Sequence, residues 1–178
     1  MEPLKLKNLC EMKVGTLRDA SSLIKSGESL VYSFQHPQAL YLGYIPKEAV
    51  VIWRYPKTEN LFIQKYGWTY FTWSYSTELV ILTGLVSHVY EIGSLKVRLT
   101  FYIYDPMKFA TSLRASELDE KFNEYLEEMF KDKETADFSD LQNMHYISIK
   151  FMDMNRQFQK FGVAITAIDP PGYNGFEC

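Results

Sequence analysis

The segment from Leu95 to Tyr104 constrains the fold of this chain more than any other. Apolar residues alternate strictly with others: Leu95, Val97, Leu99, Phe101 and Ile103 against Lys96, Arg98, Thr100, Tyr102 and Tyr104. A period of two is typical of a β-strand with one face in the core and the other toward solvent or a partner. Asp105-Pro106 ends the run, because proline lacks a ladder donor. The chain must therefore cover one face of a long strand.

Shorter strands are predicted upstream of Leu95. Aromatic residues make up 16% of the chain, and such residues favour half-buried sheet surfaces. Apolar runs separated by proline and glycine predict strands at 30–34, 40–45, 49–53, 61–63, 68–73 and 79–82. The short spacings indicate antiparallel pairing. Before these strands, Thr16 can cap a short helix over 17–24, and Gly27 is placed to stop it.

Downstream of the long strand the apolar period changes to that of helices. Ser116 is predicted to cap a helix that runs to about Lys131, and Ser139 to cap a longer helix that ends near Phe161. The longer helix carries an apolar seam at steps of three and four: Leu141, Met144, Ile147, Phe151, Met154, Phe158 and Phe161. Gly162 then precedes a final strand over 163–168.

These elements predict an α+β fold with a mostly antiparallel, curved sheet, followed by two covering helices and a final strand. We expect a single domain over residues 29–171. An N-terminal segment, 1–28, with the short helix precedes it, and a tail, 172–178, follows it.

Charge and cysteine content indicate the compartment. The net charge of −3 argues against a dedicated nucleic-acid binder. Cys10 and Cys178 are interpreted as free thiols in a reducing cytoplasm, because two cysteines make no disulfide framework. The apolar stretch 79–89 is shorter than the roughly 20 residues that span a bilayer. No apolar run follows Lys5 and Lys7, so no signal peptide is predicted, and we expect a cytoplasmic protein.

The sequence offers no catalytic or metal-binding motif. His36, His88 and His145 lack carboxylates or cysteines at ligand spacing. No nucleophile elbow and no glycine-rich phosphate loop occur, and the acidic residues from Glu117 to Glu134 suit the solvated side of a helix. We therefore predict no enzyme activity, no metal and no cofactor.

Two stretches mix basic and aromatic side chains and form the candidate interaction surface. Its residues are Trp53, Arg54, Tyr55, Lys65, Tyr66, Trp68 and Trp73. Such a surface can stack single-stranded nucleic-acid bases while its cations contact phosphates. The simpler interpretation, favoured by the acidic net charge, is that the rings fill a sheet core and the cations lie at its edge.

The order of segments from Ile45 onward resembles the stomatin/prohibitin/flotillin (band-7, SPFH) domain. The similarity covers about residues 45–170, and rests on Ile45 to Val51, the Tyr66-Gly67-Trp68 turn, Lys96 to Tyr104 with its Asp-Pro exit, and Phe158 to Asp169. The resemblance implies an α/β domain that scaffolds assemblies at a membrane surface and catalyses no reaction.

Together these patterns predict a non-enzymatic scaffold or protein-interaction module. We expect its partners to be second copies or other proteins, through sheet edges or the helical seam, with peripheral membrane contact as the resemblance implies. The alternative is single-stranded nucleic-acid binding by the candidate interaction surface. A third hypothesis is an enzyme with a dispersed pocket around one of the histidines.

Overall fold

A computed structural model of the chain describes residues 4–5, 13–14, 30–33, 44–54, 60–64, 67–68, 76–131, 138 and 140–170. The strands are β1 (Leu4–Lys5), β2 (Lys13–Val14), β3 (Val31–Ser33), β4 (Tyr44–Ile45), β5 (Ala49–Arg54), β6 (Leu61–Gln64), β7 (Gly67–Trp68), β8 (Ser76–Leu82), β9 (Val86–Ile92), β10 (Leu95–Ile103) and β11 (Val163–Asp169). The helices are α2 (Pro106–Ser112), α3 (Ala115–Phe130) and α4 (Leu141–Gln159).

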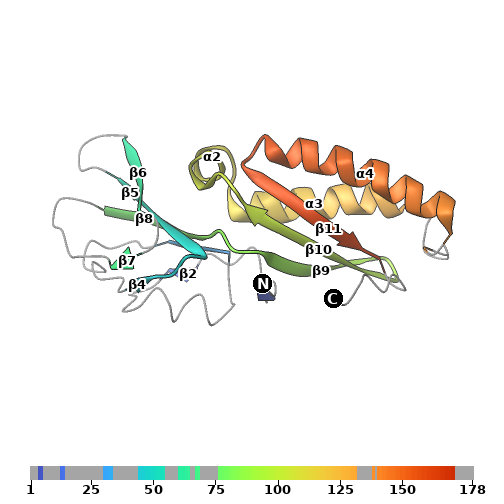
Figure 1. Ribbon diagram of the computed structural model, residues 1–178, viewed down its shortest axis with the longest axis horizontal. Coiled ribbons are helices and arrows are strands. Elements are labelled where there is room, and N and C mark those ends of the chain that lie inside the picture. The colour runs from blue at the N-terminus through green and yellow to red at the C-terminus, as the bar shows by residue number, and fades with distance from the viewer. Residues whose placement is uncertain are drawn as a thin grey trace.

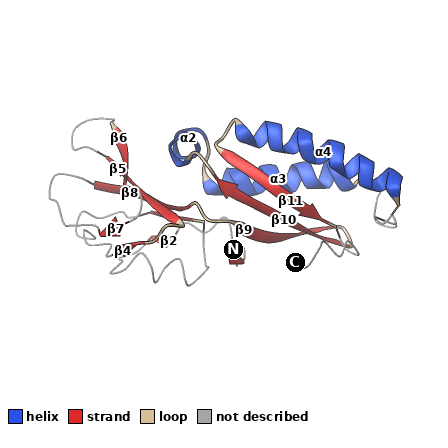
Figure 2. Ribbon diagram, in the orientation of Figure 1, coloured by secondary structure: helices blue, strands red, loops and turns tan. Residues whose placement is uncertain are grey.

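The α+β prediction is confirmed, but the described strands form three sheets instead of one. Their orders are β1-β9-β10-β11, β2-β3-β8-β5-β6 and β4-β7. Figure 1 shows the two larger sheets side by side along the molecule, and Figure 2 shows α3 and α4 beside the sheet that contains β9, β10 and β11. The division occurs after β8: the Thr83 N–H donates to the Glu48 carbonyl, one step beyond the Ala49–Leu82 pair of β5 and β8, and the Gly84 N–H donates to the same carbonyl before β9 begins.

The alternation predicted for the long strand is confirmed in β10. Leu95, Val97, Leu99, Phe101 and Ile103 are all buried. The strand pairs antiparallel with β9 through a two-residue turn, in which Leu95 lies opposite Ile92, and antiparallel with β11 on its other side. A register shift lies between Thr100 and Phe101, where β11 carries the extra residue Thr166. Such a bulge bends the strand that contains it.

The prediction of two helices is wrong, since three follow β10. The Asp-Pro pair ends the strand as predicted, but it also starts α2. Asp105 is the N-cap, and its carboxylate accepts a hydrogen bond of 3.0 Å from the Lys108 N–H. Pro106 occupies the first helical turn, where a missing N–H costs nothing.

The two longer helices have the predicted apolar faces but different caps. Arg114, not Ser116, precedes α3, and its N–H donates to the Glu117 carboxylate at 2.9 Å. Asp140 precedes α4, and Ser139 lies outside the described residues. In the part of the chain that the structure describes, no helix is both long and apolar enough to cross a membrane.

A buried aromatic cluster joins the helices to the sheet. Phe122 of α3 lies at its centre, with its ring centroid 4.9 Å from that of Phe101 on β10 and 4.4 Å from that of Phe158 on α4. Tyr90 of β9 contacts Phe122 edge-on and donates a 2.8 Å hydrogen bond to Asp119 of α3. One side chain thus contacts β9, β10 and α4 together.

Gly162 fixes the turn between α4 and β11. Its φ is +78°, and a Cβ built there would lie 2.4 Å from the Asp105 carbonyl oxygen. The Gly162 carbonyl accepts hydrogen bonds from the N–H groups of Tyr104 and Asp105, at 3.0 and 3.2 Å. The turn therefore packs directly on the end of β10.

The predicted short helix over 17–24 and the tail 172–178 lie outside the described residues. The predicted strands at 30–34, 49–53, 61–63 and 79–82 correspond to β3, β5, β6 and β8. Within 40–45 and 68–73, the described strands are the short β4 and β7, which pair through Tyr44 with Trp68 and Ile45 with Gly67.

Candidate interaction groove

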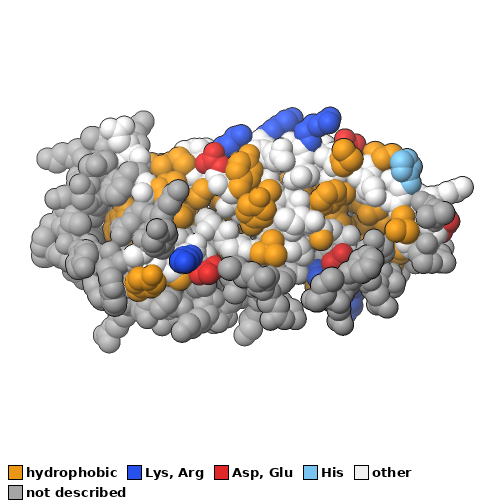
Figure 3. Space-filling view, in the orientation of Figure 1, with side chains coloured by type: hydrophobic (Ala, Val, Ile, Leu, Met, Phe, Trp, Pro, Cys, Tyr) orange, Lys and Arg blue, Asp and Glu red, His pale blue; other side chains and the backbone are white. Residues whose placement is uncertain are grey.

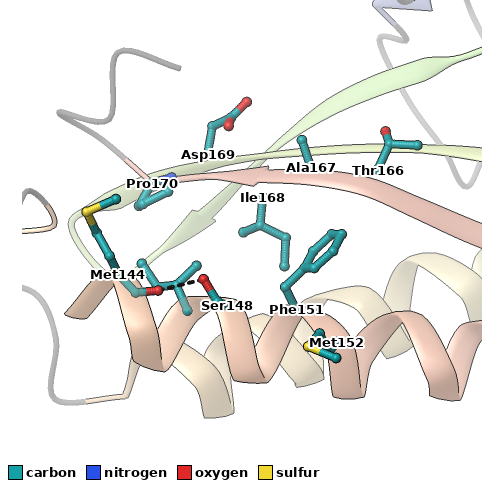
Figure 4. A pocket seen from close by; sticks show the side chains of 10 residues that line it. Met144, Ser148, Phe151, Met152, Thr166, Ala167, Ile168, Asp169 and Pro170 are labelled. Carbon is teal, nitrogen blue, oxygen red and sulfur yellow. Dashed lines mark hydrogen bonds between the residues drawn. The ribbon is translucent and has the colours of Figure 1, made fainter. Parts of the chain in front are cut away.

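An apolar groove lies between α4 and β11, and we call it the α4–β11 groove. It has a volume of about 330 Å³. Its walls are the α4 residues Met144, Ile147, Ser148, Phe151 and Met152 and the β11-side residues Thr166, Ala167, Ile168, Asp169 and Pro170. Figure 4 shows Ile168 and Phe151 extending between the strand and the helix.

The position of the groove follows from the connection between its two walls. The turn at Gly162 joins the end of α4 to the start of β11. The groove is built from the other halves of both elements, residues 144–152 and 166–170, which are far from that turn along the chain. Near the turn, by contrast, the side chains of Met154 and Phe158 are buried between helix and sheet.

A side chain of α4 binds the backbone of β11 beside the groove. The Asn155 Oδ1 accepts a 3.0 Å hydrogen bond from the Ile165 N–H. Next along the strand, the Thr166 hydroxyl donates to the Thr100 carbonyl at 3.0 Å, across the bulge. β11 is the last strand of its sheet, and no other described strand pairs with its outer edge.

Helix α4 carries two exposed apolar side chains here: Met152, which lines the groove, and Ile149, which does not. Met152 is 64% exposed and Ile149, one helical turn before it, is 48% exposed. Both lie off the seam that packs on the sheet. Figure 3 shows several separate apolar side chains over the part of the surface where α4 and β11 lie, and others toward the opposite end of the molecule. Large exposed apolar side chains beside an apolar groove are candidates for contact with a partner.

Asp169 is the one charged residue among the described residues that line the groove. Figure 4 shows its carboxylate pointing away from α4, on the same side of the strand as Thr166 and Ala167. Burial raises the pKa of this carboxyl above its ordinary value, and Arg98, its partner in register on β10, opposes the shift. The carboxylate therefore lies in partly desolvated surroundings at the sheet edge.

Another, smaller hollow lies between α3 and α4, beside a hydrogen bond that joins the two helices. It holds about 140 Å³ beside Tyr125, Glu128, Lys150 and Asp153. The Tyr125 hydroxyl donates to the Lys150 carbonyl at 3.2 Å, and desolvation, followed by the charges of Asp153 and Glu128, raises the pKa of this phenol. The phenol therefore stays protonated and can serve as a donor between the helices.

The candidate interaction surface predicted from the sequence is described only in part. Trp53 is 4% exposed on β5, opposite Phe62 in register. Arg54 ends β5 and Trp68 ends β7. Tyr55, Lys65, Tyr66 and Trp73 lie outside the described residues. The candidate surface therefore stays a prediction, and of its described residues Trp53 lies in the core.

The two described histidines of the dispersed-pocket hypothesis lie on different elements, β9 and α4. His88 packs edge-on against Tyr90 on β9, with ring centroids 4.9 Å apart. His145 is exposed on α4, and His36 lies outside the described residues. Within the described residues, no three His, Cys, Asp or Glu side chains gather as a metal site would require.

The sequence contained one sign of a further apolar surface near the α4–β11 groove, namely apolar residues of α4 that lie outside its seam. Ile149 and Met152 interrupt the polar side of α4, whereas Met144, Ile147 and Phe151 belong to the seam. Apolar residues on the wrong side of an amphipathic helix indicate a second apolar surface. The seam itself was correctly predicted to be apolar, but its pairing with β11 required the register of that strand.

Comparisons with protein-family models, with curated proteins and with solved structures find no significant match to this chain. Functional inference therefore depends on the geometry of the groove and on its chemistry.

Proposed function

We propose that this protein is a non-enzymatic interaction module that associates with copies of itself. The observation that carries the proposal is the apolar surface that α4 presents beside the groove, with Met152 64% and Ile149 48% exposed. Large apolar side chains in this arrangement gain free energy when a partner removes them from water. The groove lining consists chiefly of Met, Ile, Phe, Ala and Pro, and such a lining favours contact with protein over chemistry on a substrate.

The order of elements supports a relation in fold to the SPFH scaffold domains. A long amphipathic strand, β10, leads through Asp105-Pro106 to helices, and Gly162-Val163 opens a final strand. This order agrees with the sequence resemblance from Lys96 to Asp169. A scaffold role of this kind requires binding surfaces and no catalytic residues.

The two helices α4 of neighbouring copies would supply the contact. In a two-fold dimer each residue is used twice, so Ile149 and Met152 of both copies contribute. Ile149 does not line the groove, so a substitution there changes the proposed helix contact without changing the groove lining. The contact surface of a single helix is small, and we expect a weak, reversible dimer whose population rises with concentration.

Sedimentation velocity over a wide concentration range tests this proposal. The wild-type sedimentation coefficient should rise with concentration, and Ile149→Lys should shift the rise to roughly 100-fold higher concentration, because two buried isoleucines at about 1.5 kcal/mol each are lost. Val89→Lys is the matched control, since Val89 is a β-branched residue, 45% exposed, on β9. It should leave the concentration dependence unchanged.

Flotation with lipid vesicles, zwitterionic in one sample and anionic in another, separates protein contact from membrane contact. The proposal predicts self-association in the absence of vesicles. A protein that stays monomeric at every concentration contradicts self-association, and one that also ignores vesicles removes the scaffold interpretation. If the protein assembles only on vesicles, the membrane is required for assembly, and the proposed contact between α4 helices in solution is wrong.

A further inference from the structure

We infer that the α4–β11 groove binds an extended peptide segment that adds to the edge of β11, with apolar side chains toward α4 and a Lys or Arg beside Asp169. The inference rests on the proposed function, because it names the chemistry of a partner for an interaction module. Three observations carry it: an edge strand, an apolar wall above it and a carboxylate on its far side.

The edge of β11 supplies backbone hydrogen bonds for an added strand. β11 ends the order of its sheet, so within the described residues β10 alone occupies its ladder. Asn155 accepts from the Ile165 N–H, which shows that this amide is directed toward α4 and not into the β10 ladder. After Ile165, the next residues along the chain, 166–170, line the groove. An added strand of four residues, about 14 Å long, would run along residues 166–169, because β11 ends at Asp169 and Pro170 has no N–H to donate.

The apolar wall selects the side chains that face the helix. Along an added strand, alternate side chains point to opposite faces of the sheet. Those that point toward α4 meet Ile147, Phe151 and Met152, together with Ile168 of β11. Methionine adapts its shape to different apolar partners, so this wall accepts aliphatic and aromatic residues alike. The partner therefore has apolar residues at positions separated by two.

The carboxylate on the other face selects the intervening residue. Unlike charges already pair across neighbouring strands of this face: Lys96 contacts Glu91 at 3.4 Å, and Arg98 lies opposite Asp169 in register. Among the described residues, Arg98 is the cation that acts on Asp169, and it lies on the β10 side. A residue of an added strand opposite Asp169 would lie on the outer side. A Lys or Arg there continues the alternation of charge, whereas Asp or Glu would be repelled.

Selection from a random seven-residue display library on the immobilised full chain tests this inference. We expect a consensus of apolar, basic, apolar at successive positions. A synthetic peptide of that consensus should bind in fluorescence anisotropy, and replacing its basic residue by Glu should weaken binding at least tenfold. Asp169→Asn should reduce the preference for the basic peptide roughly threefold to fivefold, because a single partly exposed ion pair is lost.

Two controls place the peptide in the groove. Ser148 lines the groove and is exposed, so Ser148→Lys should weaken peptide binding at least tenfold, whereas Val89→Lys should not change it. With ¹³C-labelled methionine methyl groups, the NMR signals of Met144 and Met152 should shift on binding. Met129, which is buried on α3, serves as the internal reference.

The inference is overturned if the library yields no consensus, if the consensus lacks a basic residue, or if Ser148→Lys binds the selected peptide normally. Met152 belongs both to the groove and to the proposed helix contact, so peptide binding is measured below the concentration at which the sedimentation coefficient rises. A protein that self-associates but selects no peptide retains the proposed function and loses this inference. A monomeric protein that selects the apolar and basic consensus retains the groove and loses self-association.

Discussion

Gly162 fixes the turn between the two elements that form the α4–β11 groove. The φ of Gly162 is +78°, and a Cβ at this position would collide with the Asp105 carbonyl oxygen. No other residue therefore fits here without movement of the backbone. The turn holds the end of α4 against the end of β10. The turn joins α4 to β11, the two elements whose other halves form the walls of the groove.

Gly162→Ala should lower the free energy of unfolding by about 3 kcal/mol, through backbone strain and the collision with Asp105. Gly93 is the control, since it has φ +59° but is exposed in the turn between β9 and β10. Gly93→Ala should cost only about 1 kcal/mol. Urea unfolding of both variants measures the difference, and equal losses would show that the Asp105 contact is unimportant.

Asp169 gives the stability of the protein a defined pH dependence. Its pKa in the folded protein is raised by burial, so the folded state holds this proton at pH values where the unfolded chain has lost it. The corresponding stabilisation is complete below the ordinary pKa of aspartate and is lost as pH rises through the raised value. Asp169→Asn should therefore gain stability relative to the wild type as pH rises through that window.

Arg98→Met provides the opposite test of the same linkage. Arg98 lowers the pKa of Asp169, so its removal should raise that pKa further and steepen the loss of stability with pH. Urea unfolding between pH 3 and pH 7 measures both slopes. If Asp169→Asn follows the wild type in parallel over this range, the carboxyl group has no shifted pKa.

At the scale of elements, α3 joins the sheet to α4 through Phe122. Its ring contacts those of Tyr90, Phe101 and Phe158, which belong to three other elements. Phe122→Ala should lower the free energy of unfolding by about 3–5 kcal/mol, and Phe122→Leu by less, because part of the cavity stays filled. A shift of the urea midpoint measures both. A loss below about 1 kcal/mol for the alanine variant would contradict a central role for this ring.

Elements with a periodic pattern in their own residues could be predicted from the sequence, whereas features that depend on distant residues could not. The alternation in β10 and the apolar faces of α3 and α4 are periodic and were predicted correctly. Helix α2 was missed because its signal is short: one N-cap aspartate and one proline, which also mark the end of a strand. The division into separate sheets was missed because it depends on which strands pair over long range: β8 pairs with β3 and β5, whereas β9 pairs with β1 and β10.

The groove was only partly predictable for the same reason. In its helix wall, Met152 could be recognised as an apolar residue off the seam, and Met144, Ile147 and Phe151 belong to the seam. Its strand wall depends on the bulge at Thr166, which shifts Ile168 back toward the core and places Asp169 opposite Arg98. A bulge has no reliable local signal in these residues, so the pairing of the two walls could not be read from the sequence.

At the scale of the whole molecule, the described helices lie beside one of the two larger sheets, and the apolar surface lies at that end of the molecule (Figure 1). The core is complete on the side of Phe122, so folding does not require Ile149 and Met152. Their exposure therefore leaves apolar surface for a partner. An interaction module needs this combination of a closed core and an open apolar edge.

Sedimentation velocity of the wild type beside Ile149→Lys and Val89→Lys tests self-association most directly. We predict a sedimentation coefficient that rises with concentration for the wild type and for Val89→Lys, with the rise displaced roughly 100-fold for Ile149→Lys. A single concentration-independent species of monomer mass in all three proteins would contradict the proposed function.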